Sequence, residues 1–575
     1  MVGVKLPLGE FELLVDLVII IASKSGYLVL RILKMEKIEV SHTERPLDEK
    51  SGVVEVKTIT GSDAFNEAML KEPPKPFTPR SFFLYFACLL GFFCSTANGY
   101  DGSLLNILLI NDTFKDFFHG SNSGIWAGLV TSMYQIGSVV ALPFIGPALD
   151  HLGRRGGMWL GAGFIIIGTV VQGVTVHMTD YLAATHQYMG GRFLLGFGVS
   201  LAASAGPMYV VEVTHPAYRG VVTALYNTFW FTGSIVASGA GRGTINMAGN
   251  ISWLVPNWLQ MLFSGMIFCF ILFMPESPRW LYVHGKQEKC KEFLRLYHGN
   301  GNADSVWVQL QLQEYDEHLE LDGADKRWWD YRALFRDRAS RYRIFVNIMV
   351  SIYGQWAGNS VLSYFLSAVL DTAGITDATT QANIAVGINC LQFVIAICGA
   401  MMADRLGRRP LLLFANIGCS IVWVCMTASS AVFAQSGQNN ASAAKATLAF
   451  IYIFSVIFSF GFTPLQALYP VEVLSFEMRA KGMAFSNLAV SAGGLLNQFA
   501  WPISLQKIGW KTYIIFAIWC AFQAFTIYLV CPETKGRTLE ELDDIFKAPN
   551  PRKESTMKKK IALDAHANVV EVVDA

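Results

Sequence analysis

The chain has 575 residues, of which 53% are hydrophobic and only 15% charged, and its mean hydropathy is +0.37. Soluble domains carry about 25% charged residues, so this composition excludes an ordinary soluble enzyme and indicates a protein that crosses a membrane many times. The net charge of +1 gives no basis for a partner selected by bulk charge, such as a nucleic acid. The ten cysteines include no CxxC pair and predict neither a disulfide framework nor a metal site.

Twelve apolar stretches of roughly 18–28 residues, each long enough for a membrane helix, follow one another along the chain. Six begin near Phe82, Gly124, Gly157, Met189, Tyr218 and Leu254, and six more near Ile344, Ala382, Pro410, Ala446, Ala480 and Thr512. This pattern predicts an all-α membrane protein with two six-helix bundles, 81–275 and 344–531, joined by a polar linker with short helices, 276–343. An N-terminal region, 1–80, and a C-terminal tail, 532–575, are expected to be cytoplasmic and largely disordered.

Lys and Arg gather in the central linker and in the loops after the second, fourth, eighth and tenth stretches. The positive-inside rule places this side in the cytoplasm, together with both termini. The three Asn-x-Ser/Thr sequons, at Asn111, Asn250 and Asn440, fall in loops predicted to lie on the opposite side, as glycosylation requires. We therefore expect a glycosylated, multi-pass protein of the plasma membrane.

The beginning of the chain contains a short apolar stretch, 11–22, which is interrupted by Asp16. About 12 residues are too few for a typical membrane span, and no signal-peptide cleavage pattern follows. One alternative is that translation starts at Met35, so that residues 1–34 are not part of the native protein.

The two halves share three landmarks in the same order. GPALDHLGRR at 146–155 matches GAMMADRLGRR at 399–409, and YVVEVTHPAYRG at 209–220 matches YPVEVLSFEMRAKG at 469–482. PESPRW at 275–280 then matches PETKGR at 532–537. Such a repeat indicates two duplicated halves that rock against each other around a substrate held between them near the membrane midplane.

The charged residues of these landmarks lie at predicted cytoplasmic helix ends. There they can form ion pairs in one conformation that break in another, which would make a gate. The predicted gating charges are Asp150, Arg154, Arg155, Glu212 and Arg219 in the first half and Asp404, Arg408, Arg409, Glu472 and Arg479 in the second. The alternative is that Gly-Arg-Arg only anchors the chain at the membrane surface through its positive charge. This alternative is disfavoured because the motif occurs twice, each time with an Asp before it and a Glu and an Arg further along the chain.

The duplicated D-x2-GRR motif, GGRFLLGFG at 190–198, PESPRWL and PETKGRTLEE together resemble the sugar porter family of the major facilitator superfamily over about residues 80–545. Within it, NGYDGSLLN, GQWAGNSVLSYF and LQALYPVEVLSFEMRAKG resemble the fungal lactose permease branch, which includes hexose and disaccharide carriers. The resemblance implies the major facilitator fold and a sugar transporter rather than an enzyme, which needs no cofactor and functions as a monomer.

Two predicted spans each carry a charge at bilayer depth, Asp101 in the first and Arg192 in the fourth. A charge in this position needs a partner, so the two are expected to meet. A nearby arginine favours an ionised carboxylate, whereas burial favours a protonated one, so movement of Arg192 would link protonation to the open side. The resemblance implies the same roles, because proton-coupled sugar porters are thought to use an Asp and an Arg at these motif positions. The alternative is a static ion pair that holds two helices together.

An uncharged sugar is bound by amides, hydroxyls and aromatic faces. In the seventh span the resemblance favours Gln355 above all, followed by Asn359, Ser360 and Tyr364. In other spans it points to Asn227, where the family usually has Gln, and to Gln466, which precedes Ala467 at a position usually held by Trp. Asn497 and Gln392 complete the predicted set, although any of these residues could instead hold helices together.

The smaller side chains at 227 and 467 favour a wider cavity, and therefore a disaccharide such as lactose or cellobiose. Two other functions remain open from the sequence. One is a facilitative hexose or polyol carrier without proton coupling. The other is a sugar sensor that does not transport, which the short tail after Pro532 disfavours.

Overall fold

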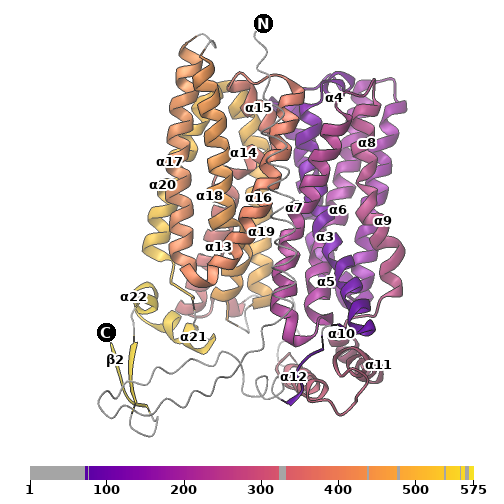
Figure 1. Cartoon of the computed structure of the whole chain (residues 1–575), viewed down its shortest axis with the longest axis vertical. Helices are drawn as coiled ribbons and strands as arrows, with labels where there is room; N and C mark the ends of the chain where they lie inside the picture. The colour runs from indigo at the N-terminus through magenta and orange to yellow at the C-terminus, as the bar shows by residue number, and fades with distance from the viewer. Residues whose placement is uncertain are drawn as a thin grey trace.

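The computed structural model describes residues 71–75, 77–322, 332–436, 440–475, 479–535, 539–556, 559–563 and 569–574. The predictions for 11–22 and for a start at Met35 lie outside this part of the chain. The described residues form two helical halves that stand side by side (Figure 1).

The first half contains six membrane crossings in the predicted order. Its helices are α3 (Pro79–Ile110), α4 (Asp112–Phe117), α5 (Gly124–Val174), α6 (Tyr181–Val213), α7 (Arg219–Thr244), α8 (Ile251–Leu259) and α9 (Met261–Phe270). Short turns η1 (Thr175–His177), η2 (Pro216–Tyr218) and η3 (Ile271–Phe273) connect or extend them. The long helix α5 contains two crossings because Gly153, with a φ of 77°, interrupts its helical geometry.

The second half begins with a broken crossing made of α13 (Arg338–Trp356), α14 (Asn359–Tyr364) and α15 (Leu366–Thr372). The first break falls at Gly358, whose φ of 101° favours glycine. Five unbroken crossings follow: α16 (Ala378–Leu406), α17 (Arg408–Gln435), α18 (Ala441–Val473), α19 (Arg479–Ile508) and α20 (Thr512–Val530), with η6 (Gly509–Lys511) before the last.

By length and composition alone, 8 stretches of the described residues could cross a membrane. Two of these stretches, Gly124–His177 and Phe485–Val530, each contain two crossings. The less apolar helix α7 and the broken element α13–α15 bring the number of crossings to the predicted twelve. The predicted all-α fold with two six-helix bundles is therefore confirmed.

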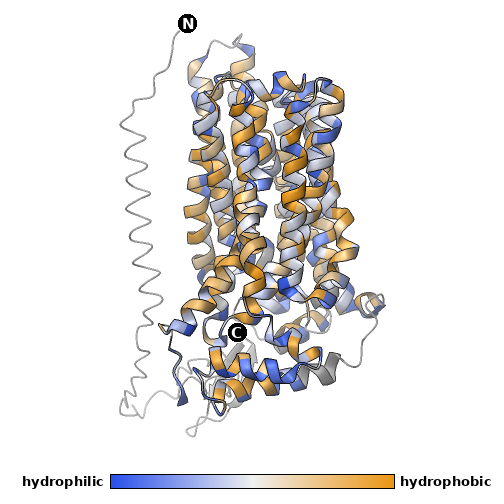
Figure 2. Cartoon of the chain, turned by 90° about the vertical axis from the view of Figure 1, so that its right-hand side faces the viewer, coloured by the Kyte–Doolittle hydropathy of each residue, from blue (hydrophilic) through white to orange (hydrophobic). Residues whose placement is uncertain are grey.

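The surface of the bundle has the apolar character that lipid requires. On α17 the side chains of Phe414, Ile417, Ile421 and Val424 are 50–59% exposed. Their spacing of three and four residues places them on one helix face, which points away from the protein. Figure 2 shows apolar residues along the whole length of the bundle's helices.

The linker helices gather at one end of the bundle (Figure 1). They are α10 (Pro278–Val283), α11 (Gln287–Phe293) and α12 (Val306–Asp322), with the turns η4 (Leu294–His298) and η5 (Arg332–Phe335). We call this end the linker end and the opposite one the far end. The linker thus joins the two halves at the same end as the charged landmarks.

The expectation of a disordered C-terminal tail is wrong for the described part of the tail. It forms α21 (Leu539–Lys547), α22 (Pro551–Thr556) and an antiparallel pair of strands, β1 (Lys559–Leu563) and β2 (Val569–Asp574). In α21 the side chains of Leu542, Ile545 and Phe546 are buried. Asp543 on the same helix pairs with Arg343, whose guanidinium also lies 4.3 Å from the ring centre of Phe546. An amphipathic pattern within a charged segment therefore docks this helix against the second half.

Two buried histidines join the linker to the end of α6. His298 lies between the main-chain oxygen of Val213 and the side chain of Gln311, at 3.0 Å from each. His215 packs edge-on against the ring of Trp307, with 4.9 Å between ring centres. Burial lowers the pKa of His298 to about 4 and that of His215 to about 3, so both rings are neutral at neutral pH.

These histidines predict that acid weakens the docking of the linker. Because their folded-state pKa values lie below the ordinary 6.5, the stabilisation is complete above pH 6.5 and is lost as the pH falls towards 4. The loss reaches about 1.4 kcal/mol per pH unit for each histidine. We expect the unfolding temperature of the purified protein to fall between pH 7 and pH 5, and to fall less in a His298→Gln variant. The control is His186→Gln, at an exposed position on α6. An equal decrease in wild type and His298→Gln would contradict the assignment.

Candidate functional site

Two helices of the first half bring Asp101 and Arg192 together. Asp101 on α3 is 0% exposed and Arg192 on α6 is 2% exposed. Nη1 of Arg192 donates a hydrogen bond to the main-chain oxygen of Asp101 at 3.3 Å. Among the described residues, neither carboxylate oxygen of Asp101 has a hydrogen-bond partner. The arginine therefore holds the backbone of Asp101 and leaves its carboxylate free.

A third helix, α5, completes this charge site. The guanidinium of Arg192 lies 5.0 Å from the ring centre of Tyr134, within the range of a cation–π interaction. The hydroxyl of Tyr134 donates to Oδ1 of Asn98 on α3 at 3.0 Å. Glycine makes this approach possible, because a Cβ on Gly196 would stand 2.0 Å from the main-chain oxygen of Tyr134. The glycine-rich sequence around Arg192 thus places the arginine beside the tyrosine.

The sugar-site candidates of the second half lie at the break between α13 and α14. Gln355, Asn359 and Tyr364 are half-buried there, whereas Ser360 and Asn497 are buried. Asn497 of α19 donates to the main-chain oxygen of Gln355 at 2.8 Å and to Oγ of Ser360 at 2.9 Å. In this conformation Asn497 and Ser360 hold the broken helix in place. Among the described residues, the side chain of Gln355 and Oδ1 of Asn359 have no hydrogen-bond partner.

The remaining candidates lie on neighbouring helices. The amide of Gln466 on α18 packs against Gly354, where a Cβ would stand 3.0 Å from it. Asn227 on α7 is exposed and Gln392 on α16 is half-buried, and these two helices pack on each other. Helix α14, which carries Tyr364, packs against α3, which carries Asp101, so the candidate sugar site borders the charge site of the first half.

The charged landmarks of the first half form one cluster at the linker end. Nε of Arg154 lies 2.9 Å from Oε2 of Glu212, which also accepts a hydrogen bond from Ser277. Glu276 accepts the main-chain N–H of Arg155 at 3.3 Å. Burial raises the pKa of Glu276 above its ordinary value, against the opposing effect of these donors.

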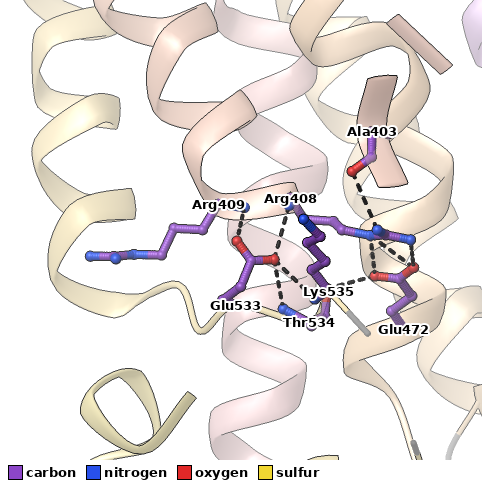
Figure 3. A network of polar contacts seen from close by, with 7 residues as sticks. All are labelled: Ala403, Arg408, Arg409, Glu472, Glu533, Thr534 and Lys535. Carbon is purple, nitrogen blue, oxygen red and sulfur yellow. Dashed lines mark hydrogen bonds and ion pairs between the residues drawn. The ribbon is translucent and has the colours of Figure 1, made fainter. Parts of the chain in front are cut away.

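The second half repeats this cluster (Figure 3). Nη2 of Arg408 lies 2.7 Å from Oε1 of Glu472, and Thr534 donates to the other oxygen of Glu472 at 2.6 Å. Glu533 accepts the main-chain N–H groups of Arg408 and Arg409 at 2.9 and 3.1 Å. A carboxylate in this position satisfies the free N–H groups at the start of α17 and complements the helix dipole.

The predicted set of gating charges does not include two glutamates, one after the last span of each half, that bind the Gly-Arg-Arg motifs. Glu276 and Glu533 cap the helix after each Gly-Arg-Arg, and the only sequence signal for them is the repeated Pro-Glu-Ser/Thr. Within the predicted set, Glu212 on α6 pairs with Arg154 on α5. Asp150 and Arg219 make no ion pair among the described residues, and the side chains of Asp404 and Arg479 lie outside them.

The three sequons share one structural role. Asn111, Asn250 and Asn440 each occupy the N-cap position of a helix at the far end of the bundle. The side-chain oxygen of Asn111 accepts the N–H of Thr113 at 3.0 Å, and Asn111 is only 4% exposed. A glycan on Asn111 does not fit this folded arrangement, so we retain only Asn250 and Asn440 as glycosylation candidates.

Two halves of six crossings with matched charge clusters define a transporter of the major facilitator type. The profile of the "Sugar (and other) transporter" family matches residues 87–546. The chain belongs to this family, the sugar porters of the major facilitator superfamily.

Similar proteins agree with this assignment. The chain is 28% identical over 483 residues to a high-affinity glucose transporter of Kluyveromyces lactis, covering 80% of this chain and 84% of the relative. It is 24% identical over 506 residues to a quinate permease of Emericella nidulans, covering 83% and 91%. The inward-open structure of the xylose transporter XylE from E. coli superimposes with a TM-score of 0.66 at 19% identity, over 80% of this chain and 99% of XylE. The solved structure supports the fold.

The cluster at Gly153 predicts a position-specific effect of adding one methyl group to α5. A Cβ on Gly153 would meet Oε2 of Glu276 at 2.4 Å, and the φ of 77° is unfavourable for alanine. We expect Gly153→Ala to destabilise the purified protein by about 1–2 kcal/mol, measured by its thermal unfolding. The control is Gly146→Ala on the same helix, where a Cβ would meet nothing within 4 Å. Equal effects of the two substitutions would contradict the role of the Glu276 cap.

Proposed function

We propose that this protein is a proton-coupled sugar importer of the plasma membrane. The single observation that carries the proposal is the free carboxylate of Asp101, which is fully buried beside an arginine that bonds only its backbone. A static ion pair would use the carboxylate oxygens, so this geometry favours a residue that exchanges its partner. Because an unpaired charge at bilayer depth is costly, we assign the neutral, protonated acid to this conformation.

The basic residues indicate which end faces the cytoplasm. The linker and the two Gly-Arg-Arg clusters all lie at the linker end, so we place this end in the cytoplasm and the far end outside. The N-caps Asn250 and Asn440, the retained glycosylation candidates, then lie on the outer side.

Hydrogen bonds between the two halves gather at the far end. Asn122 before α5 donates to Asp371 on α15 at 2.6 Å, and Asn106 on α3 accepts the main-chain N–H of Leu366 at 3.2 Å. Nε of Arg242 on α7 donates to Asn383 on α16. We therefore interpret this conformation as one that is closed to the outside, from which a proton and a sugar would leave to the cytoplasm.

These assignments give a cycle of alternating access. With the outside open, Asp101 takes up a proton while the sugar binds at the broken helix, and the halves rock together. Towards the cytoplasm both are released, after which Arg192 turns to the ionised carboxylate and the empty carrier returns. The clusters at Glu212 and Glu472 each join elements of one half, which lets each half move as a rigid body.

We propose a disaccharide such as lactose or cellobiose as the substrate. The support comes from the shorter amide at Asn227 and from the alanine at 467, where the family usually has larger side chains. The named relatives point to smaller polyhydroxylated compounds, glucose and quinate, and these belong in the same test.

The test is the Asp101→Asn variant in liposomes with an inward proton gradient. The amide has the shape of the protonated acid but cannot release a proton. We therefore expect loss of uphill accumulation, by at least about 10-fold, with exchange of labelled against unlabelled sugar retained. Accumulation and exchange are measured with labelled lactose, cellobiose, glucose and quinate, with and without a protonophore.

The matched control is Asp116→Asn, which makes the same chemical change at an exposed position on α4 and keeps Asp101; it should leave uphill accumulation unchanged. Uphill uptake by the Asp101→Asn variant would rule out proton coupling through this residue. A wild type that equilibrates the sugar but never accumulates it would instead leave a facilitative carrier. Exchange of glucose or quinate alone would overturn the disaccharide assignment without affecting the coupling.

A further inference from the structure

The interface between α5 and α19 joins the first half to the second. A Cβ on Gly124 would stand 2.5 Å from the amide of Gln506, and one on Gly128 would stand 3.2 Å from the main-chain oxygen of Gln498. Further from the far end, a Cβ on Gly494 would stand 3.4 Å from the side-chain amide of Gln135. Closer to the linker end on α5, Gly146 has no neighbour within 4 Å of its Cβ position. Helix α5 is therefore in contact with α19 at Gln135 and has no neighbour at the more distant Gly146.

This position is near the middle of the membrane. Gln135 follows Gly124, the first residue of α5, by 11 positions, or about 17 Å along the helix. Gly494 precedes Ile508, the last residue of α19, by 14 positions, or about 21 Å. The hydrocarbon core of a bilayer is about 30 Å thick, so both lie at the depth at which a transporter of this type holds its substrate.

Two consecutive glycines of α19 contact glutamines from opposite halves. A Cβ on Gly493 would stand 3.4 Å from Cβ of Gln355, just as one on Gly494 would meet Gln135. Gln355 comes from the break in the second half, and Gln135 from the first half. Because glycine has no side chain, α19 adds no group of its own beside either glutamine.

The amide of Gln135 is free to bind. Its side chain is half-buried and makes no hydrogen bond to the described residues. An amide at bilayer depth with no protein partner is costly unless it finds another polar group. A sugar hydroxyl matches it, because an amide offers both donors and an acceptor.

The preceding residue ties this amide to the charge site. Tyr134 lies under the guanidinium of Arg192, while Gln135 faces Gly494 of the other half. Consecutive residues of one helix thus contact the charge site on one side and the candidate sugar site on the other. A ligand held by Gln135 would fix the stretch of α5 against which Arg192 rests.

We infer that Gln135 is a sugar-binding residue contributed by the first half, which grips the substrate together with Gln355 of the second. This inference rests on the proposed sugar transport and deepens it by naming a residue outside the set predicted from the sequence. A sugar that bridges both amides couples the two halves directly, and it does so one residue away from the contact with Arg192.

The test compares binding of a sugar and of its monodeoxy analogues to the purified full-length protein. The sugar is the one of the four compounds above that the wild type transports. We expect Gln135→Leu to bind the parent sugar about 3–10-fold more weakly, as the loss of one hydrogen bond requires. We also expect one deoxy analogue to bind Gln135→Leu as well as the parent sugar does, because the missing hydroxyl has lost its partner. Gln135→Asn, which keeps the amide, should restore part of the discrimination.

The control variant is Gln187→Leu, which removes another half-buried amide of the first half. Gln187 donates to the main-chain oxygen of Val171 at 3.1 Å, so its loss should affect stability and leave the analogue pattern of the wild type. Equal analogue patterns in wild type and Gln135→Leu would overturn the role of Gln135 and leave the proposed transport intact. A wild type that binds none of the four compounds would overturn the proposed function, and this inference with it.

Discussion

The cost of a charge at bilayer depth is the constraint on which the rest of this structure depends. Asp101 and Arg192 are both buried, and water cannot solvate either charge in the hydrocarbon core. Their contact requires α3, α5 and α6 to approach closely, which the glycines of α5 and α6 permit. A guanidinium that is held by a main-chain oxygen and an aromatic face is stabilised without using the carboxylate. The carboxylate therefore remains able to take another partner, which the proposed proton switch requires.

A second constraint acts at the linker end, where each half must stay rigid while the halves move. Both halves contain the same arrangement of charges at this end. One carboxylate caps the helix at Gly-Arg-Arg, and a second carboxylate forms an ion pair with the first arginine of that motif. Even the tyrosines correspond, because Tyr209 donates to the main-chain oxygen of Pro275 and Tyr469 to that of Pro532, both at 2.8 Å. Since these contacts lie within a half, they resist deformation of that half without opposing its rotation against the other.

The sequence predicts the fold well because the lengths of the apolar stretches and the duplicated motifs can be read from residues that are neighbours in the chain. It predicts the proximity of Asp101 and Arg192 for the same reason, since two charges in apolar helices have few partners. It does not predict that the arginine bonds the backbone of Asp101, because that depends on the rotation of α6 against α3. The capping roles of Glu276 and Glu533 are missed because their partners are main-chain N–H groups more than a hundred residues away. The docked helix α21 is missed because overall charge conceals its apolar face.

The position of Gln135 illustrates what composition and motif cannot supply. A glutamine in a membrane helix is compatible with helix packing, lipid snorkelling or ligand binding, and its own sequence neighbours do not distinguish them. The proposal for Gln135 depends on α19, whose two consecutive glycines contact Gln135 of the first half and Gln355 of the second. In the proposed cycle the two amides belong to halves that rotate against each other, so their distance would change with conformation. A substrate that bonds both stabilises the conformations in which they converge, and this differential binding is what allows a sugar to shift the equilibrium between open states.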